Sequence, residues 1–439
     1  MPVPLDYRDS DGAQIDLMIS RLPSSEPQQR RGVLLLNPGG PGGSGLGFST
    51  MLAARGLPRG VLDRYDLIGM DTRGIGHSAP ISCGFTEGDG YEGNIPPYAV
   101  DDAAVATQAE AAGQVAQRCA AHDNTGRLPH VTTANMARDL DRIRAAVGEE
   151  KASYLGYSYG ASLGAAYASM FPETTDRIVL DSNYGDTHLD RDGLRRYALG
   201  MEQTFPDFAA WAAARHDHYG LGRTPQEVRR TYLDLARRLD HTPADGMNGG
   251  RFRLNTFVSL YNEASYEPTA QAWKSLLDSE NAGSATDTPA PAPAPSPHDN
   301  MWSVFLAVTC NDVQWPEDIG TYQRAVTEDR AKYPLFGAAA ANITPCSYWP
   351  HEPAEPPVAV NPDGPANVLI VQNQRDPVTP MRGGELLNDK FGDRSRLLGI
   401  DGSGHGGYIL GNNACAREIT TSYLVDGILP EHDTTCEAQ

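Results

Sequence analysis

Gly156-Tyr157-Ser158-Tyr159-Gly160 has the pattern G-x-S-x-G and stands between two apolar runs. Residues 152–155 before it are short enough for a buried strand, and residues 161–170 after it are rich in small side chains and predict a tightly packed helix. A sharp strand-to-helix turn of this kind uses glycine to fit the turn, and it holds the serine hydroxyl above the end of a sheet. Ser158 is therefore a candidate nucleophile, although the pentapeptide alone is a weak signal.

Two further residues stand in the order that an α/β-hydrolase requires, with an acid and then a histidine downstream of the serine. Asp376 follows a predicted strand at residues 367–372, and His405 follows another at residues 396–400. Taken singly, the aspartate could be a turn residue before proline and the histidine a surface residue in a glycine loop. Their order favours a catalytic triad with Ser158, in which the histidine takes the serine proton and the carboxylate orients the imidazole.

A glycine-rich segment supplies the fourth part of such a site. The apolar residues 32–36 predict a strand that leads into Asn37-Pro38-Gly39-Gly40-Pro41-Gly42-Gly43-Ser44-Gly45. Glycines let backbone N–H groups approach a substrate oxygen closely. We expect the N–H groups of Gly40 and Tyr159 to form an oxyanion hole.

The same segment also fits a dinucleotide-binding fingerprint. Gly40-x-Gly42-x-x-Gly45 follows a strand, and Asp66 lies at about the spacing of a ribose-binding acid. Pro41 stiffens a loop whose amides would have to wrap a pyrophosphate, and a nucleotide site would leave the serine, aspartate and histidine unexplained. We therefore expect neither a nucleotide nor another cofactor.

Five segments carry a resemblance to a known family. They are residues 37–45, Asp71-Thr72-Arg73-Gly74-Ile75-Gly76-His77-Ser78, residues 156–160, Cys310-Asn311-Asp312 and residues 376–436. They resemble the secreted tripeptidyl aminopeptidases of actinomycetes, which belong with the prolyl aminopeptidases among the serine peptidases of α/β-hydrolase fold. The likeness covers nearly the whole chain, and it is specific in the catalytic half and loose in the middle. It implies that residues 71–78 brace the oxyanion loop.

The resemblance implies a serine exopeptidase without cofactor or metal. Such an enzyme would release short peptides, with tripeptides the expected product, or single residues from free N-termini through an acyl-enzyme. Because the fold shares its catalytic machinery among activities, a carboxylesterase or amidase acting on a neutral small molecule is the alternative. A catalytically silent binding protein would be expected to lack Ser158, Asp376 or His405, and all three are present.

An anionic pocket for the substrate ammonium would distinguish an exopeptidase from an esterase. Related prolyl aminopeptidases use carboxylates of the cap for this purpose. The cap carboxylates available here are Glu202, Asp207, Glu263, Glu267 and Asp312. Asp312 is the first choice, because Cys310 would hold its loop in place and the stretch from Trp302 to Trp315 around it is aromatic. Glu263 and Glu267 come next.

The six cysteines lie as three pairs of neighbours along the sequence, Cys83 and Cys119, Cys310 and Cys346, and Cys415 and Cys436. No C-x-x-C or histidine-rich spacing indicates a metal site. Disulfides are the favoured interpretation, and they indicate a secreted, extracellular protein. The connectivity stays open, since six cysteines can pair in many ways, and reduced thiols in a cytoplasmic enzyme are the alternative.

Composition agrees with this interpretation. The 439 residues are 40% hydrophobic, enough for one large core and a smaller second unit. The net charge of −20 argues against nucleic acid and anionic membranes as partners, and no apolar stretch is long enough to span a membrane. The start Met1-Pro2-Val3-Pro4 lacks the features of a signal peptide, so a secreted protein would carry one ahead of this sequence. We expect a monomer that binds a peptide with a free N-terminus.

Alternation of strands and helices predicts an α/β fold with a mostly parallel central sheet. The predicted strands are residues 14–20, 32–36, 65–70, 152–155, 177–181, 367–372 and 396–400. A crossover helix capped by Thr133 is indicated by helical spacing at Met136, Leu140, Ile143 and Val147.

Between the fifth and sixth predicted strands, apolar residues recur at helical spacing, as at Val228, Tyr232, Leu235 and Leu239. It predicts a mainly helical cap inserted into the core. We divide the chain into a first core part at residues 1–184, a cap at residues 185–360 and a second core part at residues 361–439. Within the cap, the proline-rich residues 287–297 predict a polyproline-like surface loop.

Overall fold

The computed structural model describes residues 1–88, 91, 93–244, 246–278 and 294–438. The first part of the predicted proline-rich loop, residues 287–293, lies outside the described residues. Its last part pairs with the segment before residue 88, where Ser296 N donates to Phe85 O at 2.9 Å and Glu87 N donates to Ala294 O at 2.8 Å.

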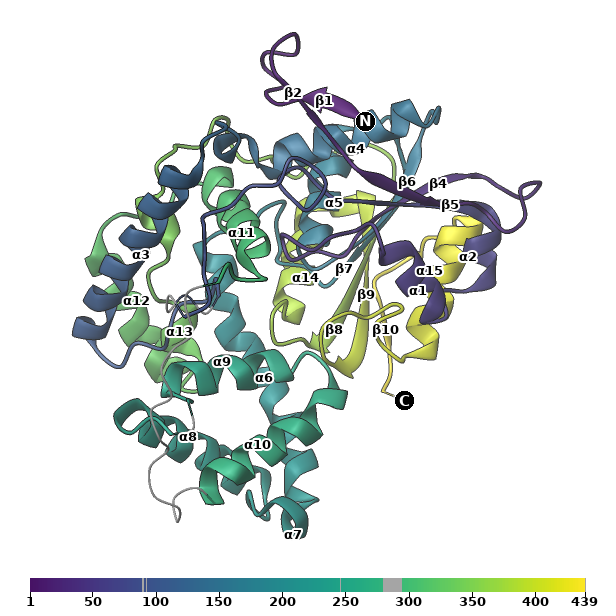
Figure 1. The fold of residues 1–439 in the computed structure, drawn as a ribbon. Helices are drawn as coiled ribbons and strands as arrows, with labels where there is room; N and C mark the ends of the chain where they lie inside the picture. Colours follow the sequence, from purple (N-terminus) through teal and green to yellow (C-terminus); the bar gives the residue numbers. More distant parts are fainter. Residues whose placement is uncertain (89–90, 92, 245, 279–293, 439) are drawn as a thin grey trace.

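An eight-stranded sheet forms the centre of the molecule (Figure 1), in the order β10-β9-β8-β7-β6-β4-β5-β3. The strands are β3 (Ile19–Leu22), β4 (Gly32–Asn37), β5 (Tyr65–Met70), β6 (Ala152–Tyr157), β7 (Thr175–Asp181), β8 (Val368–Arg375), β9 (Ser395–Ser403) and β10 (Thr434–Cys436). All neighbours pair in parallel except β3, which is antiparallel to β5. The sheet confirms the predicted α/β fold. A separate hairpin joins β1 (Pro2–Pro4) to β2 (Gln14–Asp16).

Helices cover both faces of the sheet, so its central strands β4, β5 and β6 are buried along their whole length. Along β4, Leu34 and Leu36 belong to one apolar cluster while Val33 and Leu35 belong to the other, as alternation along a strand requires. The first cluster packs against α1 (Phe48–Ala54), α2 (Arg59–Arg64) and α15 (Ala414–Asp426). The second packs against α4 (Thr133–Ala146), α5 (Tyr159–Met170) and α14 (Met381–Phe391).

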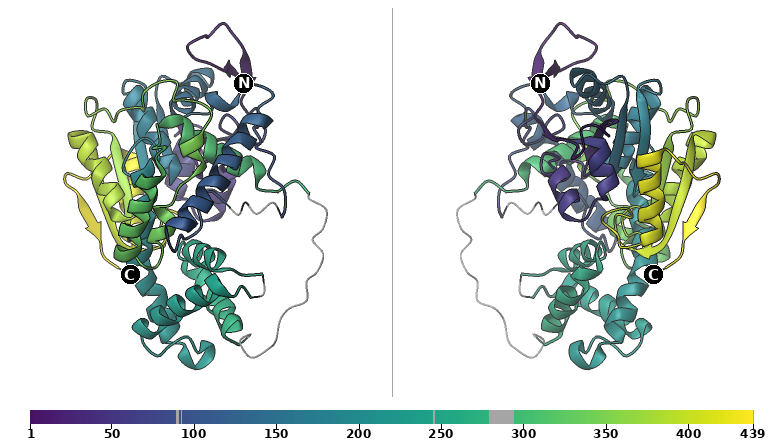
Figure 2. Two further views of the ribbon diagram at one scale, coloured as in Figure 1. Left: turned by 90° about the vertical axis from the view of Figure 1, so that its left-hand side faces the viewer. Right: turned by 90° about the vertical axis from the view of Figure 1, so that its right-hand side faces the viewer.

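The segment between β7 and β8 is helical, as expected, and Figures 1 and 2 show its first helices extending beyond one end of the sheet. Its helices are α6 (Arg191–Ala213), α7 (His216–Tyr219), α8 (Pro225–His241), α9 (Gly249–Ser259), α10 (Tyr266–Asp278), α11 (Asp299–Asp312), α12 (Ile319–Lys332) and α13 (Gly337–Ala340). Val228, Tyr232, Leu235 and Leu239 are buried along α8. The first core part also contributes to this layer, because α3 (Asp102–His122) packs against α12 and against a short 3-10 helix, η4 (Pro345–Tyr348).

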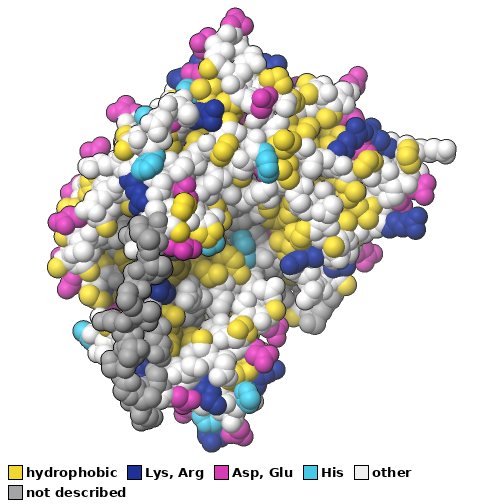
Figure 3. All heavy atoms as spheres, in the orientation of Figure 1, with side chains coloured by type: hydrophobic (Ala, Val, Ile, Leu, Met, Phe, Trp, Pro, Cys, Tyr) yellow, Lys and Arg dark blue, Asp and Glu magenta, His cyan; other side chains and the backbone are white. Residues whose placement is uncertain are grey.

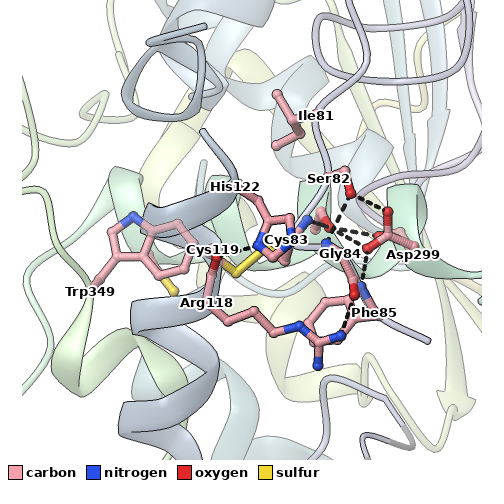
Figure 4. Close-up of a disulfide and its surroundings, with 12 residues drawn as sticks. Ile81, Ser82, Cys83, Gly84, Phe85, Arg118, Cys119, His122, Asp299 and Trp349 are labelled. Atoms are coloured by element: carbon pink, nitrogen blue, oxygen red, sulfur yellow. Dashed lines mark hydrogen bonds between the residues drawn. A yellow bond between two sulfur atoms is a disulfide. The ribbon is translucent and has the colours of Figure 1, made fainter. Parts of the chain in front are cut away.

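Three disulfides join Cys83 to Cys119, Cys310 to Cys346 and Cys415 to Cys436. The first fastens the loop after β5 to α3, and Asp299 of α11 holds the same loop by accepting from Phe85 N at 2.7 Å and from Ser82 Oγ (Figure 4). The second joins α11 to η4, and the third joins α15 to β10. Within the described ranges, no helix is both long and apolar enough to cross a membrane.

Candidate active site

Ser158 lies in a sharp turn between β6 and α5, with φ 58° and ψ −125°. Positive φ is strained for a serine. The flanking glycines make the turn sterically allowed, because a Cβ at Gly156 would approach Gly160 O to 2.2 Å and a Cβ at Gly160 would approach Asn37 O to 2.7 Å. A backbone hydrogen bond to the end of β7 also holds the turn, since Ser158 N donates to Asp181 O at 2.9 Å. This is the geometry of a nucleophile elbow.

Asp376 and His405 lie after β8 and β9, at the same edge of the sheet as Ser158, because the parallel strands end there. His405 Nδ1 lies 2.9 Å from Asp376 Oδ2 and 3.1 Å from Oδ1. The buried carboxylate also accepts from the N–H groups of Val378 and Thr379, each at 2.9 Å, and from Thr379 Oγ1 at 2.8 Å. Burial alone would lower the pKa of His405, but the charge and hydrogen bond of Asp376 outweigh it and leave that pKa raised.

The hydroxyl of Ser158 has a different partner. Its Oγ lies 3.3 Å from the hydroxyl of Tyr184. Between the described residues there is no hydrogen bond from Ser158 Oγ to His405. His405 is instead held through its backbone, since His405 N donates to Tyr261 O at 2.9 Å, and the two rings lie 5.2 Å apart.

The glycine-rich segment after β4 lies directly on the serine turn. A Cβ at Gly39 would lie 2.3 Å from Tyr157 O and 3.0 Å from Ser158 Cβ, so only glycine allows this approach. Within the described chain, the N–H groups of Gly40 and Tyr159 have no hydrogen-bond acceptor. They are therefore available to an oxygen above Ser158. Asp71 accepts from Ser44 Oγ and from His77 N at 3.0 Å, and so tethers the same segment.

The structure argues against the dinucleotide alternative. Asp66 pairs in register with Val33, at the start of its strand, whereas the glycine-rich segment follows the far end of β4. Its buried carboxylate accepts from Ser24 N and Arg30 Nε, each at 2.8 Å, and from Arg21. It cannot reach a ribose held by the glycines.

Asp312, the preferred candidate for the ammonium site, is engaged by Thr133 in the structure. Its buried carboxylate accepts from Thr133 N at 2.8 Å and from Thr133 Oγ1 at 2.5 Å, and Thr133 Oγ1 lies 2.8 Å from Tyr159 Oη. Burial raises the pKa of Asp312 to about 7, against the opposing effect of these bonds. The carboxylate thus fastens the end of α11 to the start of α4. Thr132, and not Thr133, caps α4.

Of the other cap carboxylates, two are paired with arginine. Glu202 lies 2.8 Å from Arg229, and Asp207 lies 2.7 Å from Arg375. The exposed Glu263 lines a cavity of about 250 Å³ together with His405. The exposed Glu267 lies with Glu263 on a neighbouring hollow. Neither glutamate has a cationic partner within the described residues. Figure 3 shows a hollow near the middle of the face of the molecule that is drawn in Figure 1.

Sequence reasoning missed four residues that contact Ser158, Asp376 or the loop of His405. They are Asp181, Ser182, Tyr184 and Thr379. Thr379 stands three positions after Asp376. An aspartate in a turn often accepts from the backbone N–H of a residue shortly after it, so the contact between Thr379 N and Asp376 was open to prediction from the sequence. Asp181 is the last residue of a predicted strand and Ser182 and Tyr184 follow it, which placed all three near the site without indicating what they contact.

Comparison with known proteins identifies the family. A sequence profile described as "TAP-like protein" matches residues 333–436. Over 99% of its length, the chain is 34% identical to the tripeptidyl aminopeptidase of Streptomyces coelicolor, of which the match covers 82%. The chain belongs to the tripeptidyl aminopeptidase family. It is therefore a serine peptidase of α/β-hydrolase fold.

Two other relatives also match 99% of the chain. Serine protease Hip1 of Mycobacterium tuberculosis is 29% identical, with 86% of that protein covered. A protein named carboxylesterase B, of the same organism, is also 29% identical, with 85% covered. Relatives named for peptidase and for esterase activity thus both align along almost the whole chain.

Proposed function

We propose that this protein is a serine exopeptidase that releases short peptides, with tripeptides the expected product, or single residues from free N-termini. Ser158 is the nucleophile, His405 the general base and Asp376 the carboxylate that orients it. The observation that carries the proposal is the hydrogen-bonded His405–Asp376 pair at the sheet edge where the strained Ser158 turn also lies. The aligned tripeptidyl aminopeptidase supports the choice of substrate.

In this mechanism Ser158 Oγ bonds to the carbonyl carbon of the scissile bond while His405 Nε2 takes the serine proton. The carbonyl electrons move onto the oxygen, which the N–H groups of Gly40 and Tyr159 stabilise. When the C–N bond breaks, His405 returns the proton to the leaving amine. Water then hydrolyses the acyl-enzyme by the same steps, with His405 as base. For the first proton transfer, the hydroxyl proton of Ser158 must point toward His405.

For the substrate ammonium we propose Glu263, with Glu267 as second candidate. Glu263 shares a cavity with His405, and its carboxylate lacks a cationic partner in the described structure, so it is free to pair with an amine. Asp312 is less suited, because Thr133 occupies both of its oxygens. We propose further that residues 185–360 act as a cap that selects the substrate, and that the disulfide-bonded protein works outside the cell.

A carboxylesterase or amidase is the second candidate function. The alignment with carboxylesterase B favours keeping it, because the triad and the oxyanion hole would serve an ester equally well. The two candidates differ only in what the substrate must present to the cap.

Replacement of Ser158 by alanine tests the shared chemistry. We expect Ser158→Ala to abolish covalent labelling by a fluorophosphonate and to lower kcat by several orders of magnitude, because nucleophile and base act as a unit. Ser162→Ala is the matched control: Ser162 lies one turn further along α5, and its buried hydroxyl has no partner among the described residues. It should keep both labelling and turnover. Labelling that persists in Ser158→Ala would end the assignment.

A further inference from the structure

Tyr184 occupies a position at the nucleophile that the mechanism above does not use. It lies three residues after β7, and its hydroxyl is the hydrogen-bond partner of Ser158 Oγ at 3.3 Å. The side chain is 3% exposed. A buried hydroxyl in contact with the reacting oxygen is placed to act on the charge of that oxygen.

A second tyrosine indicates the direction of this hydrogen bond. Tyr197 of α6 donates its hydroxyl to that of Tyr184 across a long contact of 3.5 Å, and the two rings stack with centroids 6.3 Å apart. A phenol oxygen that accepts from Tyr197 has its own proton left to donate to Ser158. Burial raises the pKa of Tyr184, so the group keeps that proton.

Aromatic packing holds Tyr184 in place. Tyr197 stacks on Phe257 of α9 with centroids 5.6 Å apart, and Phe257 meets Tyr261 edge-on at 5.8 Å. Tyr261 in turn lies against His405. A continuous series of rings therefore runs from the nucleophile through two cap helices to the general base, and it orients the Tyr184 hydroxyl before substrate arrives.

We propose that Tyr184 is a further catalytic residue, whose hydroxyl donates a hydrogen bond to Ser158 Oγ while that oxygen carries negative charge. The inference rests on Ser158 being the nucleophile. Charge develops on Oγ as its proton passes to His405 during attack. It develops again when the C–Oγ bond of the acyl-enzyme breaks, the electron pair goes to Oγ and His405 returns a proton. Tyr184 keeps its own proton in both steps and acts through its dipole.

Tyr184→Phe tests the proposal, because it removes the hydroxyl and keeps the stacked ring. We expect the rate of fluorophosphonate labelling and kcat for a p-nitrophenyl ester each to fall by at least about tenfold, as for loss of a hydrogen bond to a charged group. The melting temperature should stay nearly unchanged. Tyr197→Phe is the matched control: it removes the neighbouring hydroxyl, which does not touch Ser158, and it should change the rates by less than about threefold.

Three outcomes would overturn the proposal while leaving Ser158 as nucleophile. Equal labelling rates in Tyr184→Phe and the unchanged protein would show that the hydroxyl only packs. A faster rate would show that it holds Ser158 away from His405. Equal losses in Tyr184→Phe and Tyr197→Phe would assign the effect to the pair of hydroxyls as a whole and not to the contact of Tyr184 with Ser158. Failure of the nucleophile assignment would look different, because Ser158→Ala would then still be labelled, and failure of the exopeptidase proposal would appear as equal rates on free and acetylated peptides.

Discussion

Asp312 shows how burial can turn a candidate binding residue into a structural one. Its carboxylate bonds to Thr133, which is 179 residues away in the sequence. Local sequence around Cys310 and Asp312 indicates a fixed, aromatic setting but not this partner. Burial raises the pKa of Asp312 to about 7, and the negative Glu355 adds to the effect while Thr133 opposes it. Because it is buried at this contact, the carboxyl group of Asp312 resists ionisation.

This raised pKa predicts how stability depends on pH. The folded protein keeps the Asp312 proton up to about pH 7, whereas the unfolded chain releases it near the ordinary aspartate pKa of 3.8. The folded state therefore binds more protons between these values, and the free energy of unfolding falls as pH rises through them. Asp312→Asn should reduce that fall by about 1–4 kcal/mol. Urea unfolding of the unchanged protein and of Asp312→Asn at pH 5 and pH 8 measures the fall in the free energy of unfolding. An equal fall in the two proteins would contradict a raised pKa of Asp312.

The three residues of the proposed triad were more open to prediction than their contacts were. Ser158 carries a local motif, and Asp376 and His405 each follow an apolar strand, so parallel topology alone places them at one edge. Tyr184 carries no such motif. Its contact with Ser158 depends on a turn after β7 and on a cap helix that begins at Arg191, neither of which a periodicity shows.

At the scale of elements, the end of β7 joins the loops that carry Ser158 and His405. The backbone of Asp181 accepts from Ser158 N, and its buried carboxylate accepts from Gly407 N at 2.9 Å and Tyr408 N at 2.7 Å. Ser182 Oγ accepts from Gly406 N at 3.0 Å. Three consecutive N–H groups directly after His405 are therefore fixed by two residues of one strand end.

Asp181→Asn should loosen the histidine loop. An amide group offers one acceptor oxygen, and its NH₂ would face an N–H donor, so one of the two backbone groups would lose its partner. We expect the free energy of unfolding to fall by about 1–3 kcal/mol and kcat/KM to fall by about tenfold. Asp66→Asn is the control, because Asp66 is equally buried at the opposite end of the sheet. It should lower stability alone. A loss of stability without loss of kcat/KM in Asp181→Asn would contradict this role.

The strands show which elements a sequence reveals. The central strands were placed within a few residues, and β5 at residues 65–70 was placed at both ends, because they are continuous apolar runs buried on both faces. The predicted strand at residues 14–20 is instead two strands, β2 and β3, in different sheets. The sequence did not predict β10, because it is only three residues long and two of them are threonines. This strand pairs only with β9, and the disulfide between Cys415 and Cys436 holds it in place.

At the scale of the whole molecule, the helical layer brings aromatic and acidic side chains close to His405. Helices between β7 and β8 carry Tyr197 and Phe257 toward the site, and the segment after α9 carries Tyr261 and Glu263 to the cavity beside His405. The sequence predicted that a helical insertion exists there, because its spacing changes from strand to helix. Which carboxylate of the insertion faces the histidine depends on tertiary packing and was not visible.

The choice between exopeptidase and esterase depends on that carboxylate. If Glu263 binds the substrate ammonium, acetylation of the substrate N-terminus should lower kcat/KM by at least about tenfold, because a charge-assisted hydrogen bond is lost. Glu263→Gln should lower kcat/KM for tripeptidyl p-nitroanilides with free amines by a similar factor, while a p-nitrophenyl ester is hydrolysed at nearly the unchanged rate. Asp312→Asn is the matched control, and it should keep the preference for the free amine because Thr133 occupies its carboxylate.

The outcomes of this panel separate the candidates. Equal rates on free and acetylated peptides would exclude an aminopeptidase and favour the esterase or amidase. A preference that survives Glu263→Gln but is lost in Glu267→Gln would keep the function and move the ammonium to the neighbouring hollow. Loss of the preference in Asp312→Asn alone would mean that substrate binding displaces Thr133 from that carboxylate. In that case α4 and the end of α11 must separate during turnover, although they are joined in this structure.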